Sequence, residues 1–162
     1  MIPIANVRFH CTVYAAVSPN CLDQPVFLVQ EQTTNNVGFR TFLRDVIQHI
    51  KPTSGKPYAV FDGHNAHLQK DSAKMLQGHF IPLRIPPRSC QFNSVERLFA
   101  YLKPTLCKLL AYTIPTSKDH FFELVMQACR LINAKHMKAI VISNRQHIVD
   151  CVNDAKRINK PI

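Results

Sequence analysis

Residues 59–67 decide the fold of this chain: Ala59-Val60-Phe61-Asp62-Gly63-His64-Asn65-Ala66-His67. The apolar run that ends at Phe61 is typical of a strand, and the glycine after Asp62 favours a turn. A helical pattern of apolar residues follows, from Leu68 to Leu76. We therefore expect Asp62 at the carboxyl end of a strand, where open α/β sheets bind ligands.

A second carboxylate, Glu96, follows a loop that begins with Pro86-Pro87 and leads into a helical pattern. Asn93 is a good N-cap, which places Glu96 in the first turn of this helix. Glu96 then either closes a capping box with Asn93 or presents its carboxylate to the same site as Asp62. Asp62 has its own alternative, an ordinary turn residue that accepts the amides of residues 64 and 65.

These two stretches together resemble the mariner-like DDE transposases. The resemblance is carried by a strand followed by Asp62 and His67, and then by Pro86-Pro87, Ser89, Asn93, Glu96, Phe99 and Lys103. The flanking Val13-Tyr14-Ala15-Ala16-Val17 and Phe39-x-x-Phe42-Leu43 are similar to that family too, so the resemblance covers most of the chain. Gly63 departs from the mariner pattern toward the related pogo type, and Ser94 replaces the usual proline.

The resemblance implies an α/β, ribonuclease H-like fold, in which a mixed sheet has flanking helices. We interpret residues 1–162 as one domain, with a core of about residues 7–111 and a helical C-terminal extension of about residues 116–160. The family's first strand carries the first catalytic Asp and lies between the hairpin and the Asp62 strand, but it is missing here. We expect this gap to leave two strands unpaired unless it closes or a partner supplies a strand.

The resemblance also implies that Asp62 and Glu96 are catalytic residues that ligate Mg²⁺ or Mn²⁺. Such enzymes use two divalent ions, about 3.5–4 Å apart, to clamp the attacking and leaving oxygens of a phosphodiester. Without the first Asp, metal binding and strand transfer are expected to be weak or lost, so whether the chain is an enzyme stays open. A first acid relocated to Glu31 or Asp23 would restore activity. A zinc site that includes His64, His67 and Cys90 is a further alternative, which the spacing does not require.

A positive charge favours a nucleic-acid partner. Lys and Arg number 20 against 10 for Asp and Glu, a net charge of +10, which attracts polyanions by neutralising phosphates. His67, Arg84, Arg88 and Arg97 flank the acids and are expected to contact DNA, either transposon ends or non-specific duplex. Solubility is the alternative explanation, because the basic residues are scattered along the sequence.

The leading interpretation is thus a truncated, transposon-derived DDE endonuclease domain that binds nucleic acid. The alternative is a domesticated, non-catalytic module that recruits a protein partner, or a second copy of itself, through an exposed sheet edge. Six widely spaced cysteines, no secretory leader and no apolar run of roughly 20 residues predict an intracellular protein outside the membrane, nuclear if eukaryotic.

Local patterns predict the remaining elements. We expect a hairpin of residues 7–17 and 25–30, a helix over residues 36–50, and a strand at 57–61. A helix that Gly78 ends and a strand at residues 79–84 follow, then a helix from Ser94, another from Thr116 or Ser117, and two short helices at residues 137–142 and 148–152.

Overall fold

A computed structural model describes residues 9–19, 21–31, 33–50, 55–62, 64, 67 and 69–158. The expected α/β class is confirmed. The elements are, in order, β1 (Thr12–Ser18), β2 (Cys21–Gln30), α1 (Asn36–His49), β3 (Tyr58–Phe61), α3 (Lys70–His79), β4 (Ile81–Arg84), the 3-10 turn η1 (Cys90–Phe92), α4 (Ser94–Tyr112), α5 (Lys118–Arg130) and α6 (Ala134–Ile158).

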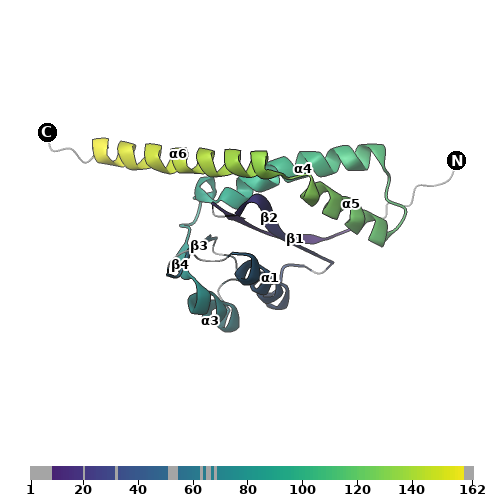
Figure 1. Cartoon of the computed structure of the whole chain (residues 1–162), viewed down its shortest axis with the longest axis horizontal. Helices are drawn as coiled ribbons and strands as arrows, with labels where there is room; N and C mark the ends of the chain where they lie inside the picture. The colour runs from purple at the N-terminus through teal and green to yellow at the C-terminus, as the bar shows by residue number, and fades with distance from the viewer. Residues whose placement is uncertain are drawn as a thin grey trace.

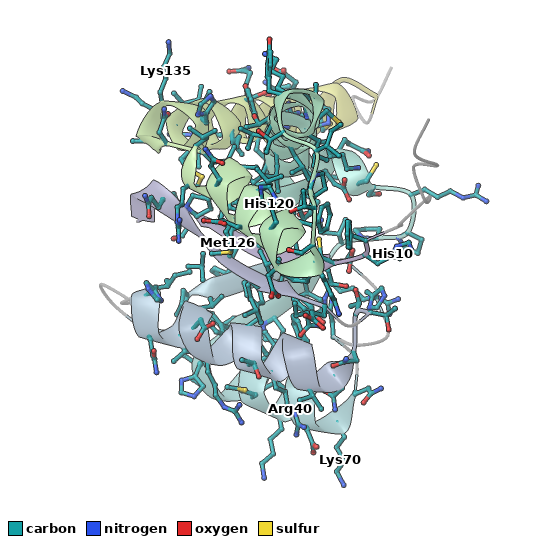
Figure 2. The ribbon with its side chains drawn as sticks, turned by 90° about the vertical axis from the view of Figure 1, so that its right-hand side faces the viewer. His10, Arg40, Lys70, His120, Met126 and Lys135 are labelled. Carbon is teal, nitrogen blue, oxygen red and sulfur yellow. The ribbon has the colours of Figure 1, made fainter. Side chains whose placement is uncertain are left out.

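The hairpin of β1 and β2 is the middle layer of the molecule. Its strands pair antiparallel from Thr12 opposite Gln30 to Ser18 opposite Cys21. Helices α4, α5 and α6 cover one face of the hairpin, and α1 lies on the other (Figure 2). Successive side chains of β1 alternate between these layers, which explains why its sequence is apolar at nearly every position.

Two hydrophobic cores fill the space between the layers. The α1 core lies under the hairpin and consists of Tyr14, Phe39, Phe42, Leu43, Val46, Leu76 and Phe80. The α4–α6 core lies above it and consists of Leu98, Leu102, Val125, Ala128, Cys129, Ile132, Met137 and Ile140. Val13, Ala15 and Val17 of β1 pack on the α4–α6 core, whereas Ala16 packs on the α1 core. β1 is therefore covered on both faces.

Among the described residues the sheet is split, as expected if the gap left by the missing first strand does not close. β3 and β4 pair in parallel, with Tyr58 opposite Ile81 and Phe61 opposite Arg84. Among the described residues β1 pairs only with β2, and β3 only with β4, which gives two separate two-stranded sheets. The antiparallel hairpin and the parallel strand-helix-strand unit are as predicted, but no described strand joins them. No strand of the described residues therefore fills the gap between β1 and β3.

Three predicted boundaries were wrong. Gly78 does not end its helix: α3 continues to His79, and the Phe80 amide donates to Leu76 O at 2.7 Å. A glycine inside a helix lowers stability by only about 1 kcal/mol relative to alanine, so the last turn of α3 can contain Gly78. The two short C-terminal helices are one helix, α6, because the polar stretch between them contains no Gly or Pro. β1 begins at Thr12, and residues 9–11 are not strand.

Helix α6 starts against the core and then extends past the body of the molecule toward the C-terminus (Figure 1). None of the helices in the described part of the chain is long and apolar enough to cross a membrane.

Candidate functional site

Asp62 and Glu96 line the same cavity. Asp62 follows β3 directly, and Glu96 lies in the first turn of α4. The cavity has a volume of about 550 Å³ and extends between β1 and β3, with α1 on one side and the start of α4 on the other. Two carboxylates that are distant in the sequence thus open into one space.

The Asp62 carboxylate is held by two donors from the turn that follows it. Its Oδ1 accepts the His64 amide at 3.1 Å, which is the expected Asx-turn contact. The same oxygen lies 3.0 Å from His67 Nδ1. The side chain is nevertheless 54% exposed, so the turn interaction fixes the carboxylate and leaves it accessible.

His67 is fixed by aromatic rings on several sides. Its ring centroid lies 4.3 Å from that of Phe39 and 5.8 Å from that of Phe61, which it meets edge to face. Burial lowers the pKa of His67 below its usual 6.5, although the neighbouring Asp62 acts in the opposite direction. The imidazole is therefore neutral at pH 7, and its Nδ1–H donates to Asp62. With 16% of its side chain exposed, His67 is placed to orient Asp62.

The burial of His67 predicts a pH-dependent stability. Because its folded pKa lies below the unfolded value of 6.5, the unfolded state binds the proton first as the pH falls. Neutral His67 contributes its full stability above the unfolded pKa of 6.5. As the pH falls from 6.5 to the folded pKa, this contribution is lost. Urea unfolding in EDTA should therefore show a smaller loss of stability on acidification in His67→Gln than in the wild type.

His79→Gln is the matched control, because His79 is exposed at the end of α3 and does not line the cavity. This variant should keep the wild-type pH profile. Equal profiles for wild type and His67→Gln would assign the acid sensitivity to another group.

Glu96 does not form a capping box with Asn93. Asn93 caps α4, since its Oδ1 accepts the Val95 amide at 3.1 Å. The Asn93 amide, which a capping box would direct to Glu96, donates instead to Cys90 O at 2.9 Å. Among the described residues the exposed Glu96 carboxylate has no hydrogen-bond partner. The helix N-terminus favours its negative charge.

The described residues do not complete a metal site. Nowhere among them do three His, Cys, Asp or Glu side chains come together in a group that could hold an ion. Glu31, one candidate for a relocated first acid, forms an ion pair with Lys118 of α5 and does not line the cavity. The side chain of Asp23, the other candidate, lies outside the described residues. Two carboxylates alone are a partial ligand set for Mg²⁺.

The three arginines expected at the site have different environments. Arg84 ends β4 and is exposed. Arg88 is exposed in the loop after Pro87, with a φ of 62° that is unfavourable for a residue other than glycine. Arg97 donates from its Nη1 to Ser143 Oγ at 2.7 Å and so connects α4 to α6. Arg84 and Arg88 are available to a ligand, whereas Arg97 has a structural partner.

Sequence patterns missed two residues of this region. Phe39 packs on His67, yet the helical pattern indicated only that it belongs to the core. Asn144 lines the cavity from α6, and its Oδ1 is buried without a hydrogen-bond partner among the described residues. Asn144 was expected in a connection between two short helices, so no local signal could place it here.

Asp62, after a strand, and Glu96, at a helix start, thus line one cavity of an α/β domain. The family model of the DDE superfamily endonucleases matches residues 4–119, and the chain belongs to this family. Endonucleases of this superfamily generally use divalent metals and act on nucleic acid. The match includes the elements from β1 to α4, and α6 lies outside it. No curated protein and no solved structure matches the chain.

Proposed function

We propose that this chain is a mariner-like, transposon-derived DDE domain that binds duplex DNA and has weak or no strand-transfer activity of its own. The main support for this proposal is that Asp62 and Glu96 line the same cavity. No third carboxylate of the described residues lines it. In a eukaryotic host the protein would act in the nucleus.

The proposed roles of the acids follow from their chemistry. Asp62 and Glu96 would be the catalytic carboxylates and would ligate Mg²⁺ or Mn²⁺ through oxygen, the ligand atom that these ions prefer. His67 would hold Asp62 in position through its Nδ1–H. A partial ligand set binds such ions weakly, which is why little catalysis is expected from this chain alone.

The proposed DNA contact is electrostatic. The net charge of +10 attracts phosphates, and Arg84 at the end of β4 and Arg88 in the loop that follows are both exposed. Other basic side chains lie on different sides of the molecule: Lys135 is at the start of α6, and Lys70 is at the start of α3 on the opposite side (Figure 2). Because these side chains do not gather on one face, the DNA proposal depends on the net charge, which favours sequence-independent binding to the DNA backbone.

Duplex DNA binding should weaken steeply with salt. Each neutralised phosphate contributes about −0.9 to the slope of log affinity against log salt, so three contacts predict roughly a 40-fold loss between about 50 and 200 mM NaCl. Fluorescence anisotropy with a labelled 20–30 base-pair duplex, about the length of a typical protein site, measures this slope. An affinity that does not change with salt would contradict the DNA proposal.

Arg84→Ala should reduce that slope by about one unit, as expected for the loss of one phosphate contact. Lys108→Ala removes the same charge from α4 at about 18 Å along the helix from Glu96, and it should leave the slope close to the wild-type value. Equal effects of the two variants would mean that only net charge matters.

Supercoiled plasmid should not be nicked appreciably by this chain in Mn²⁺. Nicking that Asp62→Asn abolishes would instead identify a functional metal centre, with a third ligand outside the described residues. Glu96→Gln should then abolish the activity as well, whereas Glu31→Gln should not, because Glu31 is paired with Lys118.

The second candidate function, a protein-interaction module, is favoured by β1 and β3, each of which pairs on one side only within the described part of the chain. It requires no metal and no DNA.

A further inference from the structure

Helix α4 has two exposed tyrosines on one side. Tyr101 is 41% exposed and Tyr112 is 91% exposed. They are about three helical turns apart, so they lie on the same side of α4, separated by roughly 16 Å along its axis. Lys108 lies between them on that side and is exposed as well. A row of two aromatic rings and one cation therefore runs along the surface of α4.

The start of α6 extends this row. The ring centroid of Tyr101 lies 5.2 Å from that of His136, at an interplanar angle of 59°. His136 is itself held at the start of its helix, because its Nδ1 accepts the Asn133 amide at 3.3 Å. Lys135, beside His136 in the sequence, is exposed. We call these residues the α4–α6 aromatic face: Tyr101, Lys108, Tyr112, Lys135 and His136.

The α4–α6 aromatic face carries two lysines and no carboxylate. The sequence contains no Asp or Glu over residues 97–118, which include most of α4, or over residues 124–149, which include the first part of α6. A polyanion that approaches this face is therefore attracted by the lysines without repulsion from acids between them. None of the five residues lines the cavity of Asp62 and Glu96, so the face is a separate surface.

Aromatic rings with cations between them suit single-stranded nucleic acid. Unpaired bases stack on aromatic side chains, and lysines neutralise the phosphates that connect the bases. In a duplex the bases are stacked on one another, so rings on a protein surface do not reach their faces. An apolar peptide would cover the rings but would gain nothing from the lysines.

We propose that the α4–α6 aromatic face binds single-stranded nucleic acid, with bases stacked on Tyr101 and Tyr112 and phosphates at Lys108 and Lys135. The chain then has two nucleic-acid surfaces of different kinds, because the exposed arginines near β4 contact only the backbone of a duplex. This second surface goes beyond the proposed duplex binding and requires neither a metal ion nor catalysis.

Fluorescein-labelled oligo(dT) and oligo(rU) of about 15 nucleotides, within the usual range of site sizes, serve as the probes. Anisotropy titration of the whole chain measures their affinity. Tyr112→Ala should weaken binding about fivefold or more, as expected for the loss of one stacked base. Tyr112→Phe keeps the ring and should bind within about twofold of wild type. Both probes should bind, since the contacts are to bases and phosphates.

Tyr58→Ala is the matched control, because Tyr58 is a 66% exposed tyrosine of β3 outside the α4–α6 aromatic face. It should bind oligo(dT) within about twofold of wild type. Intrinsic fluorescence gives a second measurement, since the chain contains no Trp and 4 Tyr. Oligo(dT) should quench this emission in the wild type, and it should quench less in Tyr112→Phe, whereas Tyr58→Phe should retain the quenching contributed by the stacked rings.

Lys108→Ala separates the two nucleic-acid surfaces. It should reduce the salt slope for oligo(dT) by about 0.7 and leave the slope for duplex DNA close to wild type. Arg84→Ala should have the reverse effect. Failure of the duplex proposal would leave the oligo(dT) results unchanged, so the two proposals fail separately.

Several outcomes would overturn the proposal. These are no saturable binding of either probe at about 50 mM NaCl, equal affinities of Tyr112→Ala and Tyr58→Ala, or no quenching of tyrosine emission. Binding that Tyr112→Ala leaves intact would mean that net charge alone holds the strand. A preference of about tenfold or more for oligo(rU) would support the proposal and identify RNA as the ligand, whereas the same preference for oligo(dT) would support it with DNA.

Discussion

Leu98→Ala should lower the free energy of unfolding by about 3 kcal/mol, as expected for removing a leucine from a closed core. Leu98 is 0% exposed and lies in the α4–α6 core, where α4 meets α5, α6 and the inner face of the hairpin. A natural domain is stable by about 5–15 kcal/mol, so this loss is a large share of the total. Urea unfolding followed by far-UV circular dichroism measures it.

Leu131→Ala is the matched control, since Leu131 is the half-exposed residue that ends α5. It should change the unfolding free energy by about 0.5 kcal/mol or less. If Leu98→Ala costs under about 1 kcal/mol, the α4–α6 core is not packed as described. Because Leu98 follows Glu96 by two residues in α4, the same core also fixes the position of that carboxylate.

Local signals predicted the parts of the fold that depend on neighbouring residues. Asn35, Asn93 and Ser117 cap α1, α4 and α5, each through a side-chain oxygen that accepts an amide in the first turn. Such contacts span two or three residues, so the sequence carries the whole interaction. The Asp62 turn is of the same kind, because its Asx-turn donor, the His64 amide, lies two residues away.

Features that depend on distant contacts could not be predicted in this way. The packing of α6 on α4 is one of them, because the hydrogen bond from Arg97 of α4 to Ser143 of α6 joins residues that are far apart in the sequence. The split sheet, by contrast, agrees with the missing strand that the resemblance implied, and among the described residues no strand joins β1 to β3. One local contact was also missed, because the Asn93 amide donates to Cys90 O three residues earlier, and the capping box that the pattern allowed does not form.

Phe39→Ala should be the most damaging change near the site, with a loss of about 3–5 kcal/mol in the free energy of unfolding. Phe39 is 5% exposed, and its ring packs on Tyr14, Phe42 and His67. Removing it opens a void in the α1 core. It also exposes His67, so the pKa of His67 should rise toward 6.5, which an NMR titration of the imidazole protons detects.

Val37→Ala is the control in the same helix, because Val37 is 63% exposed. It should leave both the stability and the His67 titration close to wild type. If Phe39→Ala destabilises the protein while the pKa of His67 stays low, burial by Phe39 is not what keeps the imidazole neutral. If the pKa rises as expected, Asp62 is held by a donor whose charge state is set by a residue of α1. The position of the carboxylate then depends on core packing as well as on its own turn.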